Sequence, residues 1–156
     1  MVNVLFVCLG NICRSPMAEA MFRDLVKKEG LEHQITVDSA GTGDWHIGHL
    51  PHQGTRELLD RKGISYEGMS ARQIQSRDFD HFDYIIGMDA SNIENMKKVQ
   101  LEQSQAYVGR LLDLVSDEAV NDVPDPYYTG NFDEVHDLVE KGCKALLEKI
   151  RKENNI

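Results

Sequence analysis

The sequence of 156 residues has few cysteines, a shortage of basic side chains and no long hydrophobic run. Two of its three cysteines, Cys8 and Cys13, are close together, so the chain lacks the even, dispersed set of a disulfide-rich secreted domain. Its 17 basic residues against 26 acidic ones give a formal net charge of −9, which argues against nucleic acid or an anionic membrane as a partner. No apolar segment is long enough for a signal-peptide core or a membrane span. We therefore expect a soluble protein in a reducing compartment, the cytoplasm.

What the sequence does contain is an alternation of short apolar runs with segments of helical periodicity. One helix is expected to follow the cap pair Ser15 and Pro16 and to end at Gly30, and another is expected behind the capping pair Asn131 and Glu134. The stretch from residue 116 to 130 is polar and unpatterned, and it is expected to be a loop. The predicted strands are residues 2–7, 35–37, 84–86 and 111–115, and the other predicted helices are residues 55–62, 91–99 and 132–150.

This alternation predicts an α/β fold in which a mostly parallel sheet is covered by helices on both faces, a three-layer αβα sandwich. The chain shows no repeat, linker or low-complexity tract, so residues 1–156 are expected to form one domain. Parallel sheets of this kind bind ligands at the carboxyl ends of their strands. The loop after the first strand is therefore the first candidate site.

That loop has the sequence Cys-Leu-Gly-Asn-Ile-Cys-Arg-Ser over residues 8–15. Between a strand and a helix, successive backbone N–H groups can converge on one anion, which the helix N-terminus also faces. Gly10 is expected to supply a permissive φ, and Asn11 is the non-glycine residue that best tolerates a left-handed conformation. Arg14 adds a planar set of donors that matches two phosphate oxygens. The loop therefore predicts a phosphate-binding site.

Cys8 is the candidate nucleophile in this loop. A free cysteine is mostly protonated at neutral pH, so a nucleophilic cysteine needs its thiolate stabilised. The loop N–H groups, the helix dipole, Arg14 and the Ser15 hydroxyl can together do this, and one site would then activate the nucleophile and bind the substrate. The alternative is that Cys8 and Cys13 are small buried residues near a turn and that Arg14 is a surface charge.

The segment from Val4 to Ala20 resembles the signature of the low-molecular-weight protein tyrosine phosphatases, and further similarity lies at residues 37–39, 88–92 and 125–128. The resemblance extends over nearly the whole chain. It implies a four-stranded parallel sheet flanked by helices, with the phosphate-binding loop after the first strand, and no metal or other cofactor. It makes Cys8 the nucleophile, Arg14 the phosphate clamp and Asp125 the general acid. The substrate-binding positions that it implies are Leu9, Gly10, Asn11, Ile12, Cys13, Ser15, Trp45, Tyr127 and Tyr128.

The same resemblance implies a supporting set of residues. It places Ser39 in a hydrogen-bond network with Asn11 and Asp89 near the phosphate-binding arginine. Many relatives have a histidine where this chain has Met69, so the support of Asn11 is expected to differ here. Together with their spacing, the resemblance also suggests that Cys13 forms a reversible disulfide with the nucleophile, which would protect the thiolate from irreversible oxidation.

Asp125 stands between two prolines, Pro124 and Pro126, which restrict the backbone and would hold its carboxyl group in place. An aryl phosphate leaves as a phenolate, whose expulsion at neutral pH benefits from a positioned proton donor. The alternative is that this segment is only a rigid surface turn. The aromatic residues Trp45, Tyr127 and Tyr128 lie in polar loop contexts, where a deep slot could admit a phosphotyrosine ring and leave phosphoserine too short to reach the cysteine.

Four other activities are compatible with parts of this pattern. Arsenate reductases that resemble this loop need a relay of extra cysteines, and the remaining Cys143 lies within the last predicted helix. Protein-arginine phosphatases of this fold tend to have threonine in place of Ile12 and to lack the tyrosine pair. A catalytically silent phosphotyrosine-binding module is disfavoured by the intact catalytic set. A metal-binding protein is suggested by His46, His49 and His52, but Gly48 and Pro51 prevent a helix there.

The expected function is therefore hydrolysis of protein phosphotyrosine through a cysteinyl-phosphate intermediate. The expected partners are a phosphotyrosine-containing protein substrate and a cognate tyrosine kinase, with no nucleic acid and no membrane.

Overall fold

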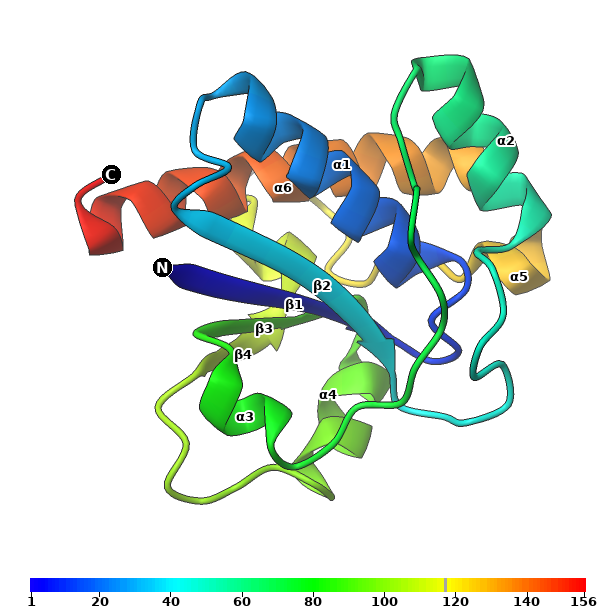
Figure 1. Ribbon diagram of the computed structural model, residues 1–156. Coiled ribbons are helices and arrows are strands. Elements are labelled where there is room, and N and C mark those ends of the chain that lie inside the picture. The colour runs from blue at the N-terminus through cyan, green and yellow to red at the C-terminus, as the bar shows by residue number, and fades with distance from the viewer. Residues whose placement is uncertain (117) are drawn as a thin grey trace.

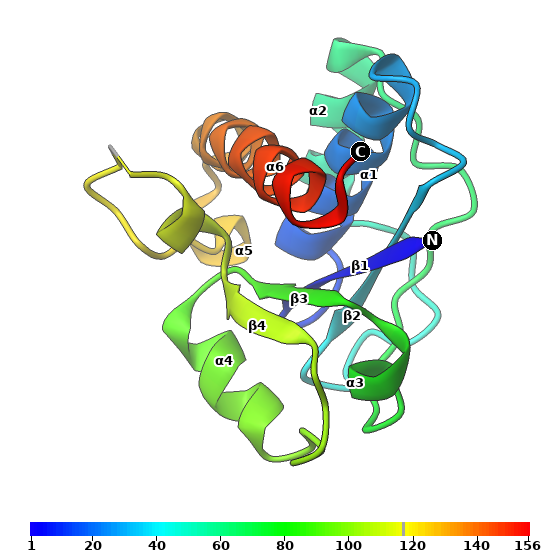
Figure 2. The same ribbon diagram turned by 90° about the vertical axis from the view of Figure 1, so that its left-hand side faces the viewer.

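The computed structural model describes residues 1–116 and 118–156. Over these residues its centre is one sheet of four parallel strands in the order β2-β1-β3-β4. Helices cover both faces of this sheet, which gives the three layers expected from the sequence (Figures 1 and 2). The strands are β1 (Val2–Cys8), β2 (Ile35–Gly41), β3 (Tyr84–Gly87) and β4 (Tyr107–Arg110). One face carries α1 (Arg14–Lys28), α2 (Gln53–Lys62) and α6 (Phe132–Asn154), and the other carries α3 (Asp78–His81) and α4 (Ala90–Lys97).

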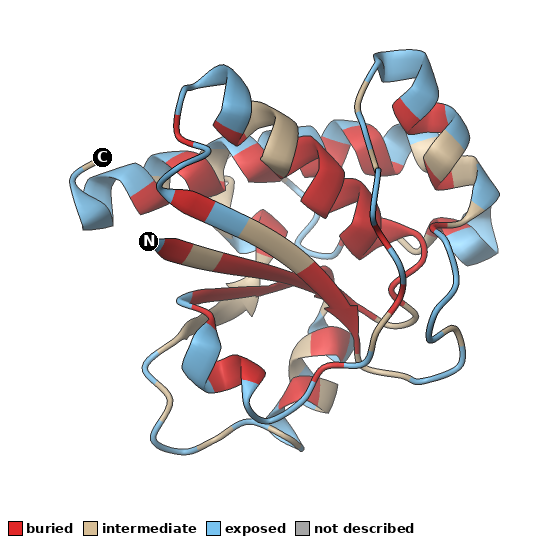
Figure 3. Cartoon of the chain, in the orientation of Figure 1, coloured by how far each residue is buried: buried red, intermediate tan, exposed pale blue. Residues whose placement is uncertain are grey.

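The central strand β1 is apolar except at Asn3, because both of its faces are covered. Val4 and Phe6 pack into the core beneath α1 and α6, whereas Leu5 and Val7 pack into the core on the side of α3 and α4. All four side chains are fully buried (Figure 3). Cys8 ends the strand and belongs to the same face as Phe6. The strand alternation therefore directs this thiol toward the layer that contains α1.

The predicted helix ends were largely correct. The side chain of Asn131 accepts the backbone N–H of Glu134 at 3.1 Å at the start of α6, and α2 ends at Gly63 in the left-handed conformation. The prediction for α1 was wrong in one respect: Cys13, not Ser15, occupies the N-cap, and no side chain caps this helix. The Ser15 hydroxyl is instead used in the loop before it.

The prediction of the fourth strand was also wrong. Residues 111–114 form a 3-10 helix, η1 (Leu111–Leu114), and the strand β4 precedes them. Leu111 is fully buried because it packs against α6, where it lies directly over Gly142. Its apolar side chain therefore reflects this helix contact and not a strand. Strand β4 is at the edge of the sheet and is half-buried throughout, so it carries no strong apolar signal.

The expected loop from residue 116 to 130 contains one short helix, α5 (Pro126–Thr129). Residue 117, which belongs to that prediction, lies outside the described residues. In the described part of the chain, no helix combines the length and the hydrophobicity needed to cross a membrane.

Candidate active site

The loop of residues 9–13 lies between β1 and α1. Backbone N–H groups of the segment after β2 hold its start in place by donating to carbonyl groups. The backbone N–H of Thr42, which follows β2, donates to the carbonyl of Cys8 at 2.9 Å. The next N–H, that of Gly43, donates to the carbonyl of Leu9, also at 2.9 Å. By contrast, the N–H groups of residues 9–13 donate to no carbonyl in the described residues. Since buried N–H groups nearly always have a partner, this row of donors is suited to an anion.

Two glycines allow other groups to approach this loop closely. Gly10 does not have a positive φ, so the expectation of a permissive φ was wrong. A Cβ there would instead lie 2.9 Å from Cδ2 of His46, which packs against the loop. At the end of β2, a Cβ on Gly41 would lie 2.8 Å from the carbonyl oxygen of Leu9 and 3.1 Å from the nitrogen of Asn11. Gly41 is therefore required by space, because its neighbours are backbone atoms, whereas a side chain at Gly10 would displace the His46 ring.

Asn11 is fixed by its side chain at the tightest point of the loop. Its φ is 57°, the left-handed conformation expected for this residue. The Nδ2 atom donates to Oγ of Ser15 at 2.8 Å and to Oγ of Ser39 at 3.0 Å. The Oδ1 atom accepts the backbone N–H of Arg72 at 3.0 Å. The segment that contains Met69 thus supports Asn11 through a backbone group.

The Cys8 thiol lies at the centre of the loop, with its Sγ 3.0 Å from Oγ of Ser15. The second cysteine of the loop, Cys13, is also a buried free thiol. Burial raises the pKa of Cys13 to about 12, and the negative charges of Cys8 and Asp125 act in the same direction. Cys13 therefore stays protonated at neutral pH and does not compete as a nucleophile.

Arg14, the first residue of α1, is almost fully buried. Its Nη1 donates to Oδ2 of Asp89 at 2.6 Å and to the carbonyl of Val123 at 3.0 Å. Burial lowers the pKa of Arg14, but the negative charge of Cys8 and the hydrogen bond to Asp89 outweigh this and raise it above the ordinary value. The buried Nε has no hydrogen-bond partner in the described part of the chain. Arg14 is thus a fixed cation that keeps its Nε–H and one Nη2–H available to phosphate oxygens.

Two helix-capping aspartates hold the guanidinium from outside the loop. At the start of α4, Oδ1 of Asp89 accepts the backbone N–H of Asn92 at 2.8 Å, which leaves Oδ2 for Arg14. At the start of α5, Oδ1 of Asp125 accepts the backbone N–H of Tyr127 at 3.0 Å, while its Oδ2 lies 3.4 Å from Nη2 of Arg14. Each carboxylate therefore links a helix N-terminus to the Arg14 guanidinium.

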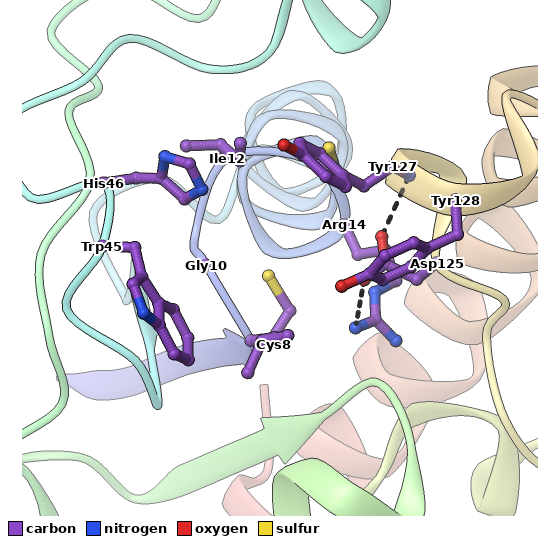
Figure 4. Close-up of a pocket in the computed structure, with 11 residues that line it drawn as sticks. Cys8, Gly10, Ile12, Arg14, Trp45, His46, Asp125, Tyr127 and Tyr128 are labelled. Carbon is purple, nitrogen blue, oxygen red and sulfur yellow. Dashed lines mark hydrogen bonds and ion pairs between the residues drawn. The ribbon is translucent and has the colours of Figure 1, made fainter.

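These groups surround a cavity of about 210 Å³. Cys8 lies at its base, with Trp45 and His46 on one side and the α5 segment with Asp125 on the other (Figure 4). The side walls are open to solvent, since Trp45 is 66% and Tyr128 is 76% exposed. The residues that line the cavity are Cys8, Leu9, Gly10, Ile12, Cys13, Arg14, Trp45, His46, Asp125, Tyr127 and Tyr128.

The cavity brings together most of the predicted site residues. Asn11 and Ser15, predicted to bind substrate, are buried and do not line it. Their side chains hold the loop, as that of Ser39 does, and Asp89 contacts Arg14.

The three histidines between β2 and α2, which were considered as metal ligands, make other contacts. Nδ1 of His52 accepts the backbone N–H of Gly54 at 3.0 Å and caps α2, and its ring stacks on Phe132 at a centroid distance of 5.3 Å. The ring of His46 lies against His49, with 5.4 Å between centroids. Within residues 1–116 and 118–156 no group of three or more His, Cys, Asp or Glu side chains is arranged to hold a metal.

Sequence reasoning did not assign three residues to this site. His46 was considered only as a metal ligand, yet it lines the cavity. Arg72 supports Asn11 by a backbone group from 61 residues away, and a backbone contact over that distance leaves no signal in the sequence. Glu19 was not singled out, although it lies one helical turn after Ser15 and so on the same side of α1. That spacing was a usable signal.

Together, the fold and the site define a cysteine-dependent phosphatase of the Cys-x5-Arg type, with a thiol at the end of the first strand and an arginine at the start of the following helix. Residues 3–156 match the family model described as low molecular weight phosphotyrosine protein phosphatase. The chain belongs to this family.

Its similarity to known members extends over the full length. The low molecular weight protein-tyrosine-phosphatase YfkJ of Bacillus subtilis (strain 168) is 58% identical over 156 residues, 100% of both chains. The crystal structure of YfkJ has a TM-score of 0.95 and covers 99% of this chain and 97% of that one. PtpA of Staphylococcus aureus, a phosphatase with the same family name, is 44% identical over 100% of this chain and 98% of its own.

One similar structure is that of a Drosophila arginine phosphatase, with 33% identity, a TM-score of 0.88 and coverage of 95% of this chain and 97% of that one. Because proteins with different substrate names have this fold, the substrate must be inferred from the pocket.

Proposed function

We propose that this protein hydrolyses phosphotyrosine in protein substrates through a cysteinyl-phosphate intermediate. In the first step the Cys8 thiolate attacks phosphorus and forms an S–P bond, while the bond from phosphorus to the phenolic oxygen breaks. Asp125 gives its proton to that oxygen, so that tyrosine leaves neutral. The loop N–H groups and Arg14 stabilise the equatorial phosphate oxygens as charge shifts across them.

In the second step Asp125, now ionised, takes a proton from a water molecule that attacks phosphorus. The S–P bond breaks, inorganic phosphate forms and Cys8 returns to the thiolate. The observation that carries this mechanism is the 3.4 Å ion pair between Asp125 and Arg14 on the edge of the Cys8 cavity. It supports the role of Asp125, because the first step needs a proton donor next to the phosphate site.

The walls of the cavity support an aromatic substrate. Ile12 supplies an apolar contact near the loop, and Trp45 and Tyr127 provide flat faces on opposite sides. A protein phosphotyrosine is therefore the proposed substrate, in the cytoplasm, where the three free cysteines would stay reduced. A cognate tyrosine kinase would supply this substrate.

The same features argue against the alternatives. Cys143 is buried in α6 and burial raises its pKa, so it is a poor candidate for the thiol relay of an arsenate reductase. The assembled set of Cys8, Arg14 and Asp125 argues against a silent binding module.

Turnover of p-nitrophenyl phosphate and of a phosphotyrosine peptide tests the proposal. We expect Cys8→Ser and Arg14→Lys to abolish turnover, and wild-type activity to survive EDTA. Asp125→Ala should lower kcat by about 10²–10⁴ for the peptide and by less for p-nitrophenyl phosphate, whose phenolate leaves more easily. Acid quenching followed by mass spectrometry should detect phosphate on Cys8.

The control is Asp133→Ala, at an exposed position at the start of α6. Turnover retained by Cys8→Ser would exclude the mechanism. A phosphoarginine peptide of the same sequence that is hydrolysed faster than the phosphotyrosine peptide would exclude the proposed substrate.

A further inference from the structure

A continuous chain of hydrogen bonds leads from the buried carboxylate of Glu19 to the nucleophile. The Ser39 hydroxyl lies 2.6 Å from Oε1 of Glu19. Nδ2 of Asn11 donates to Ser39 at 3.0 Å and to Ser15 at 2.8 Å, and Ser15 lies 3.0 Å from the sulfur of Cys8. Glu19 itself is 7% exposed and lies outside the cavity.

The direction of each hydrogen bond follows from the available donors and acceptors. The backbone N–H of Arg72 can only donate, so it fixes Oδ1 of Asn11 as the acceptor and turns both Nδ2 hydrogens toward the serines. Ser15 then accepts from Asn11, which leaves its own hydrogen for the Cys8 sulfur. Ser39 likewise accepts from Asn11, so its hydrogen must go to Glu19. An ionised carboxylate can only accept, so Glu19 holds the Ser39 hydrogen and supports, from the other end of the chain, the arrangement that the Arg72 N–H fixes at Asn11.

We propose that Glu19 is a positioning residue for the proposed phosphatase reaction: its carboxylate orients Ser39 and, through Asn11 and Ser15, directs a hydrogen-bond donor at the Cys8 thiolate. Protonation of Glu19 releases the Ser39 end of this chain, because a carboxylic acid can donate to Ser39, whose own hydrogen is then free to turn toward Asn11. The inference deepens the proposed function and rests on it.

The charged groups around Glu19 do not give it a strong cationic partner. On its own helix, Nη1 of Arg23 is 3.9 Å from Oε2 and its side chain is 41% exposed. From β2, Asp38 repels the carboxylate. From the segment before α3, Arg72 attracts it, but that guanidinium already binds Asp38 and Asp78, at 3.1 Å each. Burial, opposed by the Ser39 hydrogen bond, raises the pKa of Glu19 to about 6. The constraint would therefore be released within a mildly acidic range.

Alkylation of Cys8 by iodoacetamide across pH 5 to 8 tests the proposal without turnover, with the modified residue located by fragment mass spectrometry. We compare the wild type with Glu19→Gln, which keeps the shape but not the charge. The alkylation rate constant of the wild type should equal that of Glu19→Gln at pH 5. At pH 7.5 it should be about three- to ten-fold higher than that of the variant, because the wild-type carboxylate is then ionised. The kcat for p-nitrophenyl phosphate should show the same ratio, with KM nearly unchanged.

Two controls make the result specific. Exposed Glu32→Gln should behave as the wild type at every pH. On a Ser39→Ala background, Glu19→Gln should have no further effect, because the chain is already interrupted. A rate ratio that is the same at all pH values would assign Glu19 a merely structural role and overturn the proposal. An undiminished effect of Glu19→Gln on the Ser39→Ala background would also overturn it. If the pH-dependent alkylation ratio appears but no phosphate ester is hydrolysed, the proposed function fails, and only the effect of Glu19 on the Cys8 thiolate is retained.

Discussion

Gly41 has no room for a side chain, because the phosphate-binding loop lies directly against the end of β2. The carbonyl of Leu9 and the nitrogen of Asn11 would be within 2.8 and 3.1 Å of a Cβ, and both are backbone atoms that cannot rotate away. A methyl group there must displace the loop itself. The position thus links the geometry of the strand end to that of the Cys8 site.

We expect Gly41→Ala to lower the kcat for p-nitrophenyl phosphate at least about ten-fold and to cost about 1–3 kcal/mol of stability. The matched control is Gly63→Ala, where φ is 69° and the space is open. That change should cost about 1–2 kcal/mol through the left-handed backbone alone and leave kcat unaltered. Steady-state kinetics of both variants measure kcat, and urea unfolding measures their stability. Equal kcat values for the two variants would contradict the steric argument.

Two short helices, α4 and α5, begin beside Arg14. Their capping carboxylates, Asp89 and Asp125, each use one oxygen for the helix and one for Arg14. A substitution at either position can therefore affect helix stability and catalysis separately.

Asp89→Asn and Asp89→Ala separate these two effects. Asparagine still caps α4, so its stability should be close to that of the wild type, whereas alanine should cost about 1 kcal/mol more. Both variants lose the charged bond to Arg14, and kcat/KM should fall about ten-fold or more in each. Urea unfolding and steady-state kinetics measure the two quantities. Full kcat/KM in Asp89→Asn would show that the arginine does not depend on this carboxylate.

The sequence predicted those elements whose signal is local. The apolar run of β1, interrupted only by Asn3, and the apolar stripe of α6 identified both elements, because each buries side chains at its own period. The edge strand β4 and the 3-10 helix after it were misassigned, since burial of Leu111 comes from contact with α6 and not from strand pairing. At the site, Cys8 and Arg14 were predictable from their spacing. The link from Arg72 to the loop depends on a tertiary contact that no local pattern encodes. The position of Glu19, one helical turn after Ser15, was a local signal, but its contact with Ser39 of β2 is also tertiary.

The whole molecule carries a net charge of −9, yet the proposed substrate is an anion. Capture must therefore depend on the local field of the loop, where the free N–H groups and buried Arg14 face the cavity. The negative charge of Glu19, 7% exposed and close to this site, works against folding at neutral pH. Functional groups commonly lower stability in this way.

The stability of the protein should depend on pH through Glu19. Its pKa is raised from 4.5 to about 6, so in this range the folded state binds more protons than the unfolded state, and stability falls as pH rises. The shift corresponds to about 2 kcal/mol. Glu19→Gln does not titrate, so its free energy of unfolding relative to the wild type should increase by about 2 kcal/mol between pH 4 and pH 7. Urea unfolding at both pH values measures this difference, with Glu32→Gln to account for the loss of one surface charge. If the relative stability of Glu19→Gln stays constant or decreases, Glu19 is not a destabilised carboxylate, and the mildly acidic range assigned to the release of Cys8 support would also be wrong.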